Sequence, residues 1–221
     1  MHTIHTHHAA EAAPHRVHHR AFAIMREDNA RQGFFDHTGF ERVLLHLPED
    51  LKDFVRFGYY SGWRKGEVAQ LRWEHIHDGA IRLPPELDKS NEGRVIKLVG
   101  TIAAIVDRRQ ALQRPDVPWV FYRERQGKVW PVIRFDKVWK RACKAAGVPD
   151  RLFHDFRRTA ARNMDQAGVP QQVQMKALGH KTDSMWRRYR ISDEQEVEQA
   201  QVLTERFLAQ SYNLVTETKK G

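Results

Sequence analysis

The sequence contains almost no cysteine and no long apolar run. One cysteine, Cys143, occurs among the 221 residues, so neither an intrachain disulfide nor a metal cage of several thiolates can form. No stretch approaches the roughly 18 consecutive apolar residues that a membrane-spanning helix needs. The amino-terminal residues also lack the continuous apolar segment of a signal peptide. We therefore expect a cytoplasmic protein that has no membrane as its partner.

Positive charge, by contrast, is abundant. The chain has 37 lysine and arginine residues against 28 aspartate and glutamate residues, which gives a net charge of +9. An excess of this sign favours polyanionic partners. Because no basic amphipathic segment stands apart from the core pattern, a nucleic acid is a better candidate than a membrane surface. A DNA-binding protein of this kind would be associated with the nucleoid.

Histidines crowd the beginning of the chain. The first twenty residues, MHTIHTHHAAEAAPHRVHHR, contain seven of the 13 histidines and show no apolar period. We expect residues 1–32 to form a disordered leader. A metal-binding tract is the alternative interpretation. The irregular histidine spacing and the single carboxylate, Glu11, count against it.

From about residue 34 the apolar pattern predicts a mostly α fold with a small antiparallel β-sheet (α+β). A polar segment separates two apolar runs and predicts a β-hairpin, whose strands carry Ile81 and Leu83, then Val95, Ile96 and Leu98. A further strand and turn are predicted within 117–130. Helices are predicted at 38–46, 48–60, from 65, and at 101–112, 133–147, 151–168, 171–179, 182–190 and 193–210. We expect one domain, 33–212, followed by a tail, 213–221.

The helix predicted at 151–168 begins with two basic groups beside an apolar face. The segment reads RLFHDFRRTAARNMDQAG, and its inward face is predicted to hold Leu152, Phe153, Phe156, Ala160, Ala161 and Met164. His154 and Arg157 lie three residues apart and therefore project from the same side. We interpret this pair as facing a phosphate group while Phe153, Phe156 and Ala160 hold the helix start in place.

Four more polar residues stand in or beside apolar context: Arg64, Lys89, His180 and Tyr189. Taken singly, each candidate has an ordinary structural explanation. Arg64 could be an exposed residue at a helix start, Lys89 a solvated turn lysine, and Tyr189 a half-buried aromatic with a wet hydroxyl. In the same way, His154 could cap its helix, Arg157 could pair with a carboxylate, and His180 could bond to a helix end.

Taken together, the six residues suit chemistry on a phosphodiester. Arginine forks match phosphate oxygens bidentately and keep their charge, and fixed positive groups stabilise the charge of the pentacovalent transition state. A tyrosine can attack the phosphorus covalently, and a lysine or histidine can give the leaving alkoxide its proton. We expect neither a metal nor another cofactor, since the guanidinium groups supply the positive field and the carboxylate clusters of a two-metal nuclease are not evident.

Two longer motifs resemble those of a known family. SGWRKGEVAQLRWEHI is similar to the first arginine box of the tyrosine recombinases, the phage integrase family, and HDFRRTAARNMDQAGVPQQVQMKALGHKTDSMWRRY resembles the second box. The resemblance covers about Phe35 to Ala200. The turn LGHK makes it closer to recombinases than to type IB topoisomerases, which use similar chemistry. The resemblance implies the catalytic-domain fold and a site-specific recombinase or integrase activity.

The resemblance also implies a role for each candidate residue. Arg64 and Arg157 would clamp the scissile phosphate, and His180 would donate to a non-bridging oxygen. His154 would assist proton transfer, Lys89 would protonate the leaving 5′ oxygen, and Tyr189 would attack to leave a 3′-phosphotyrosyl bond. Lys97 competes with Lys89 for the lysine role, but it lies within the predicted outgoing strand. The implied partners are double-stranded DNA and, on DNA, further copies of the chain in a tetramer, with a weakly associated or monomeric state in its absence.

Members of this family usually carry an amino-terminal core-binding domain that completes a clamp around DNA, and we expect it to be absent here. Fewer phosphate contacts then predict weak, salt-sensitive DNA binding. The acidic helix at 193–210 either docks on a neighbouring subunit or packs on its own domain. Two other functions stay open: a DNA-binding module of the same family that has lost activity, and metal binding by the leader.

Overall fold

The computed structural model describes residues 33–88, 91–187, 198 and 201–206. Within them the helices are α1 (His37–Leu45), α2 (Glu49–Ser61), α3 (Lys65–Ala69), α4 (Gly100–Gln110), α5 (Asp136–Ala145), α6 (Asp155–Gln166), α7 (Gln171–Leu178) and α8 (Asp183–Arg187). The strands are β1 (Ile76–His77), β2 (Ala80–Leu83), β3 (Arg94–Lys97), β4 (Tyr122–Arg125) and β5 (Lys128–Pro131). Short 3-10 turns occupy Trp73–His75 and Pro85–Leu87.

The helix ends follow local chemistry. At the start of α1 the Asp36 carboxylate accepts a hydrogen bond of 2.6 Å from the Gly39 amide, which satisfies a donor that has no partner inside the helix. Prolines precede α2 and α7, at Pro48 and Pro170, where their fixed φ suits a helix entry. The helices predicted at 38–46, 48–60, 101–112 and 171–179 agree with α1, α2, α4 and α7 to within a few residues.

The β-strands form two small antiparallel sheets. In the three-stranded sheet β2 lies between β1 and β3, with Ile81 paired to both Ile76 and Ile96. The predicted hairpin is β2 and β3, and the strand expected within 117–130 belongs to a second hairpin, β4 and β5. Within β3, Val95 is 51% exposed, and Arg94 and Ile96 occupy the inward positions.

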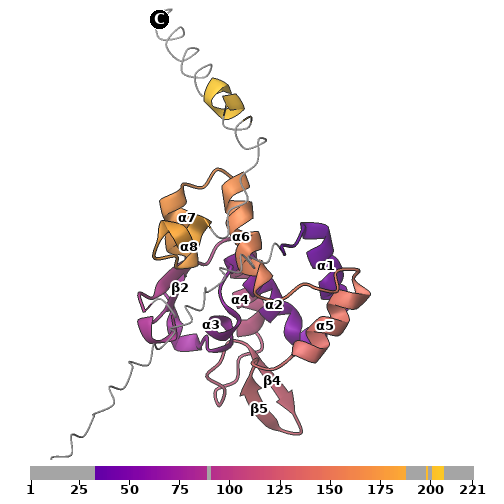
Figure 1. Ribbon diagram of the computed structural model, residues 1–221. Coiled ribbons are helices and arrows are strands. Elements are labelled where there is room, and N and C mark those ends of the chain that lie inside the picture. The colour runs from indigo at the N-terminus through magenta and orange to yellow at the C-terminus, as the bar shows by residue number, and fades with distance from the viewer. Residues whose placement is uncertain (1–32, 89–90, 188–197, 199–200, 207–221) are drawn as a thin grey trace, which may run out of the picture. The chain divides into compact units, whose positions relative to one another are not determined.

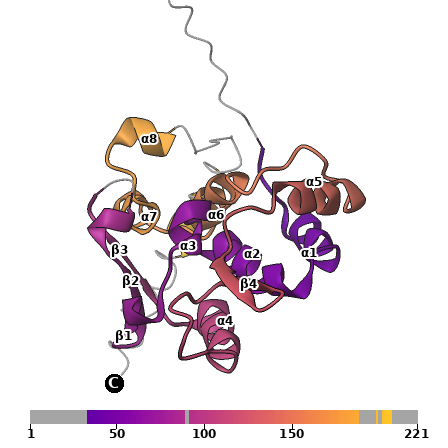
Figure 2. The ribbon, with the colours of Figure 1, turned by 90° about the horizontal axis from the view of Figure 1, so that it is seen from below.

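Helix α2 is the central element of the domain. It packs against α4 and α6. Figures 1 and 2 both show it between α1 and α5 on one side and the three-stranded sheet on the other. The mostly α fold with small antiparallel sheets that the sequence predicts is thus confirmed. None of the described helices is long and apolar enough to cross a membrane.

Aromatic rings fill the core where α2, α5 and α6 meet. Phe153 and Phe156 have ring centroids 5.0 Å apart; Phe156 lies 5.5 Å from Trp139 and Phe153 lies 5.4 Å from Phe54. These centroid distances are typical of favourable ring pairs. The start of α6 is therefore anchored, as predicted, by Phe153 and Phe156. The prediction that Leu152 lies on the inward face of this helix is wrong, because Leu152 precedes the helix and is 41% exposed.

Several predictions concern residues that lie wholly or partly outside the described ranges. The leader, 1–32, and the tail, 213–221, lie outside the described residues. Of the helix predicted at 193–210, residues 201–206 are helical and exposed, and Val202 and Leu203 of its apolar stripe are 41% and 58% exposed. The domain limits 33–212 remain a prediction.

Candidate active site

Arg64 lies at the beginning of α3, directly after the turn that ends α2. Its backbone amide donates to the Glu67 carboxylate (2.8 Å), and its Nη1 donates to the same carboxylate (2.7 Å). A second carboxylate, that of Asp88, lies 3.7 Å from Nη1. The two carboxylates thus hold the guanidinium from one side. The Arg64 side chain is 21% exposed, so its other side reaches solvent.

Gly62 makes the close approach of α2, α6 and α7 possible. Its φ of 64° lies in the left-handed region that favours glycine. A Cβ at this position would lie 2.7 Å from both the Ala160 Cβ and the Leu178 Cδ2. The missing side chain lets the Gly62 carbonyl come within reach of α6, where it accepts a hydrogen bond from Arg157.

Arg157, in the first turn of α6, is buried, with 1% of its surface exposed. Its Nη1 donates to the Gly62 carbonyl (3.3 Å), and its Nη2 donates to the carbonyls of Leu178 and, at 3.4 Å, Gly179. Main-chain carbonyls from two separate segments thus fix this guanidinium. These polar surroundings differ from the apolar core, and the expectation that Arg157 faces a phosphate stays a prediction.

His154 immediately precedes α6 and is exposed. Partial desolvation is the first cause that lowers the pKa of its imidazole, and the positive charges of Arg157 and Arg64 add to it. The histidine is therefore near both arginines, and the structure brings together three of the predicted residues. Their shared field favours the neutral imidazole, which is able to accept a proton.

His180 follows Gly179, whose left-handed φ of 64° ends α7. The His180 amide donates to the Met175 carbonyl (2.8 Å), which fixes the turn, and the residue is only 5% exposed. Burial lowers the pKa of its imidazole to about 3, helped by the charges of Arg157, Arg64 and Arg94. His180 is therefore neutral at pH 7. It lines a cavity of about 470 Å³ together with Glu92, Gly93, Gln172, Met175, Lys176 and Gly179.

The two remaining predicted residues, Lys89 and Tyr189, lie outside the described residues. Their neighbours in the chain are described: Asp88 reaches the Arg64 guanidinium, and α8 is described as far as Arg187. Lys97, the competitor for the lysine role, is exposed at the last position of β3. The assignment of Lys89 and Tyr189 therefore stays a prediction.

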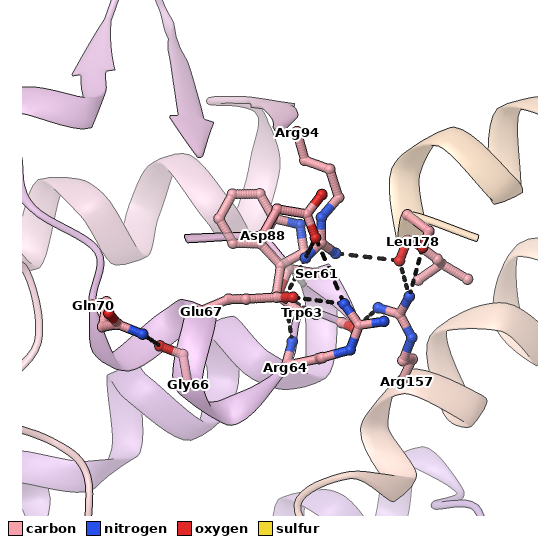
Figure 3. Close-up of polar contacts among 12 residues, drawn as sticks. Ser61, Trp63, Arg64, Gly66, Glu67, Gln70, Asp88, Arg94, Arg157 and Leu178 are labelled. Carbon is pink, nitrogen blue, oxygen red and sulfur yellow. Dashed lines mark hydrogen bonds and ion pairs between the residues drawn. The ribbon is translucent and has the colours of Figure 1, made fainter. Parts of the chain in front are cut away.

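Three charged residues that the sequence analysis did not single out connect the site: Glu67, Asp88 and Arg94. All three are buried, with 3%, 4% and 5% of their surfaces exposed. Figure 3 shows Arg94 beside Glu67 and Asp88 and next to the Leu178 carbonyl. Arg94 is in phase with Ile96 in a strand of period two, but the sequence alone does not show which of Val95 and Ile96 points inward.

The electrostatics of the site are those of an oxyanion receptor. Arg64, Arg94 and Arg157 carry three positive charges, and Glu67 and Asp88 supply two negative ones, so this set keeps a net positive charge. In the described part of the chain, no group of three or more His, Cys, Asp or Glu side chains could hold a metal ion. The arrangement is able to bind a phosphate through guanidinium and imidazole N–H groups.

Comparisons with known proteins show which family the chain resembles. The profile described as the Phage integrase family matches residues 40–196. The integrase of Salmonella phage P22 is 31% identical in an alignment of 161 residues that covers 67% of this chain and 41% of that protein. The chain thus spans less than half the length of this curated relative.

Solved structures share the fold. A lambda integrase dimer bound to a COC′ core site has a TM-score of 0.59 at 19% identity, over 73% of this chain and 50% of that one. The XerA recombinase has a TM-score of 0.60 at 16% identity, over 77% and 63%. The catalytic domain of bacteriophage HP1 integrase has a TM-score of 0.52 at 19% identity, over 71% and 86%. The family prediction made from the two arginine boxes is confirmed, and the chain belongs to the phage integrase family of tyrosine recombinases.

Proposed function

We propose that this chain acts as the catalytic domain of a site-specific DNA recombinase that breaks and rejoins DNA through a 3′-phosphotyrosyl intermediate. The observation that carries the proposal is that Arg64, Arg157 and His180 lie close together. They come from three separate segments and are held by buried carboxylates and main-chain carbonyls. Family membership adds support. A structural role alone does not require that two arginines converge on a neutral imidazole that lines a cavity.

The proposed reaction is a transesterification that needs no ATP. The Tyr189 phenol oxygen attacks the scissile phosphorus, its proton passing to His154, and the bond from phosphorus to the 5′ oxygen breaks. Lys89 gives the leaving 5′ oxygen its proton, while Arg64 and Arg157 bind the non-bridging oxygens and neutral His180 donates one N–H. The covalent bond preserves the phosphodiester energy, so a 5′ hydroxyl from another strand is able to reverse the step and join new partners.

Duplex DNA is the proposed substrate, and a positive helix face supports it. Lys137, Lys140, Arg141 and Lys144 recur on one side of α5 at helical spacing, and all four are exposed. Cations placed in this way bind phosphates without reading sequence. A relative by fold, lambda integrase, has been solved as a tetramer on a Holliday junction. We propose a tetramer on DNA for this chain as well.

The experiment that tests the function is a covalent trap. The chain and a Tyr189→Phe variant are expressed in cells, which are denatured rapidly, and DNA crosslinked to protein is recovered and sequenced. We expect an adduct from the parent chain and none from Tyr189→Phe. The recovered sequences then define the target site.

A matched control is Tyr60→Phe, which removes a phenol oxygen from a tyrosine that is 39% exposed at the end of α2. This control should keep the adduct. Equal adducts from the parent and Tyr189→Phe would show that Tyr189 is not the nucleophile. An absence of adduct from every variant would favour the alternative, a DNA-binding module that does not cleave.

A further inference from the structure

Arg94 is a buried arginine in β3 that the proposed reaction does not use. Only 2% of its side-chain surface is exposed, and its guanidinium lies 5.3 Å from the centre of the Trp63 ring. Its Nη2 pairs with Glu67 and, at 3.3 Å, with Asp88, and its Nη1 donates to the Leu178 carbonyl (3.2 Å). Two buried carboxylates already balance the charge of Arg94, so we assign its role to the neighbours that it contacts and not to a DNA phosphate.

Those neighbours hold Arg64. The same two carboxylates that bind Arg94 also bind Arg64, at 2.7 Å for Glu67 and 3.7 Å for Asp88. Without Arg94, the two negative charges of Glu67 and Asp88 would act on Arg64 alone and would cancel its positive charge. Because Arg94 shares them, Arg64 keeps positive charge available for an incoming phosphate.

The other end of the Arg94 guanidinium reaches the segment that holds Arg157 and His180. The Leu178 carbonyl accepts hydrogen bonds from both Arg94 and Arg157. One residue later, a Cβ on Gly179 would lie 3.1 Å from the Arg94 Cδ. The turn that carries His180 therefore packs directly on the Arg94 side chain. Figure 3 shows Arg94 linking the Glu67 and Asp88 side of the site to Leu178.

We propose that Arg94 is a positioning residue that fixes Arg64 and Arg157, together with the His180 turn, at the spacing that one phosphate requires. This inference rests on the proposed function. A displacement of about 1 Å in a catalytic group is enough to slow a reaction roughly 100-fold. The planar fork of arginine binds acceptors on two sides at once, and lysine, a point charge, does not reproduce that geometry.

The test uses two substitutions and a matched control in the full chain. Arg94→Met removes the charge, and Arg94→Lys keeps it but loses the fork. Arg82→Met is the control, because Arg82 is a partly buried arginine on the neighbouring strand β2, directly opposite Val95. The substrate is a duplex that carries the trapped site with a nick close to the cleaved phosphate, so that the covalent adduct accumulates in a single turnover. Binding of the same duplex is measured separately.

We expect both Arg94 variants to cleave about 10- to 100-fold more slowly than the parent, with duplex affinity within about threefold, whereas Arg82→Met cleaves at the parental rate. Parental cleavage by Arg94→Lys and Arg94→Met would overturn the inference. A proportional loss of rate and affinity would overturn it as well, because it would indicate a DNA-binding role.

A second measurement needs no DNA and therefore separates this inference from the proposed function. Hydrogen exchange of the free protein is compared between the parent and Arg94→Met. We expect faster exchange in 62–70 and 171–181, the segments that Arg94 ties together, and unchanged exchange in α4 and α5. Exchange that is faster throughout the protein, or that does not change in any segment, would refute the positioning role. If the parent chain forms no adduct, the proposed function fails, and the exchange pattern still decides whether Arg94 orders these segments.

Discussion

The start of α6 faces two environments of equal burial and opposite chemistry. Phe156 is fully buried among aromatic rings, and Arg157, the next residue, is 1% exposed among carbonyls and charged groups. Apolar burial is non-directional, and an apolar core tolerates substitutions of similar volume at modest cost. The polar side depends on each donor and acceptor, because a buried charge that loses its partner has no substitute. Burial alone therefore does not reveal how much one side chain matters.

The largest expected effect is on the polar side, at Glu67. Replacing Glu67 with glutamine removes a buried charge that two arginines share. Breaking a buried ion pair on one side costs about 3–5 kcal/mol, and we expect a loss near the lower limit because the amide keeps some hydrogen bonds. Urea unfolding monitored by circular dichroism measures it.

The matched control for Glu67→Gln is Glu49→Gln. Glu49 pairs with Lys52 at the surface, where its side chain is 85% exposed. Exposed pairs of this kind contribute little, so the unfolding midpoint should not move. If both substitutions shifted the midpoint equally, the distinction between the buried network and surface pairs would be lost.

A smaller effect is expected on the aromatic side. Phe156→Leu keeps the site apolar and removes part of a ring that packs on Trp139, Phe153 and Phe35. We expect a loss of about 1–2 kcal/mol in unfolding free energy. The rate of adduct formation per folded molecule should stay at the parental value. A drop in that rate at a temperature where the variant is folded would mean that the ring cluster sets the site geometry directly.

A further expected effect concerns pH, and it accumulates over the pH range that is scanned. Burial and three arginines lower the His180 pKa from 6.5 to about 3, so between these values the unfolded chain binds a proton that the folded chain does not. The free energy of unfolding should therefore fall as the pH drops through this range, by at most about 1.4 kcal/mol per pH unit from this residue. His180→Gln should flatten that slope relative to the parent. Parallel slopes in unfolding experiments from pH 7 to pH 4 would indicate that His180 titrates normally.

The sequence was most informative where spacing constrains chemistry. His154 and Arg157 are three residues apart at a helix start, and His180 is next to the glycine that ends a helix. These three residues, and Arg64 after Gly62, are recognisable from the sequence pattern alone. The structure brings the four together. Their roles, and those of Lys89 and Tyr189, stay predictions that the covalent trap tests.

The counter-charges were not foreseen, for a physical reason. Glu67 in a helix and Asp88 beside a turn look like surface residues, because most carboxylates are solvated. Only the fold brings them to the two arginines that justify their burial. Val95 shows the same limit in reverse: two adjacent apolar residues, Val95 and Ile96, did not reveal that Arg94, rather than Val95, points inward.

The Leu178 carbonyl carries a consequence for mutational scanning. It is a main-chain atom that two arginines share, so every amino acid placed at position 178 still supplies it. The Leu178 side chain is itself fully buried against Ala160 and Ala161. A scan would therefore rank position 178 as an ordinary core leucine and overlook its acceptor. Replacing the amide that contains this carbonyl with an ester, a weaker acceptor, by chemical protein synthesis would reveal what side-chain libraries cannot sample.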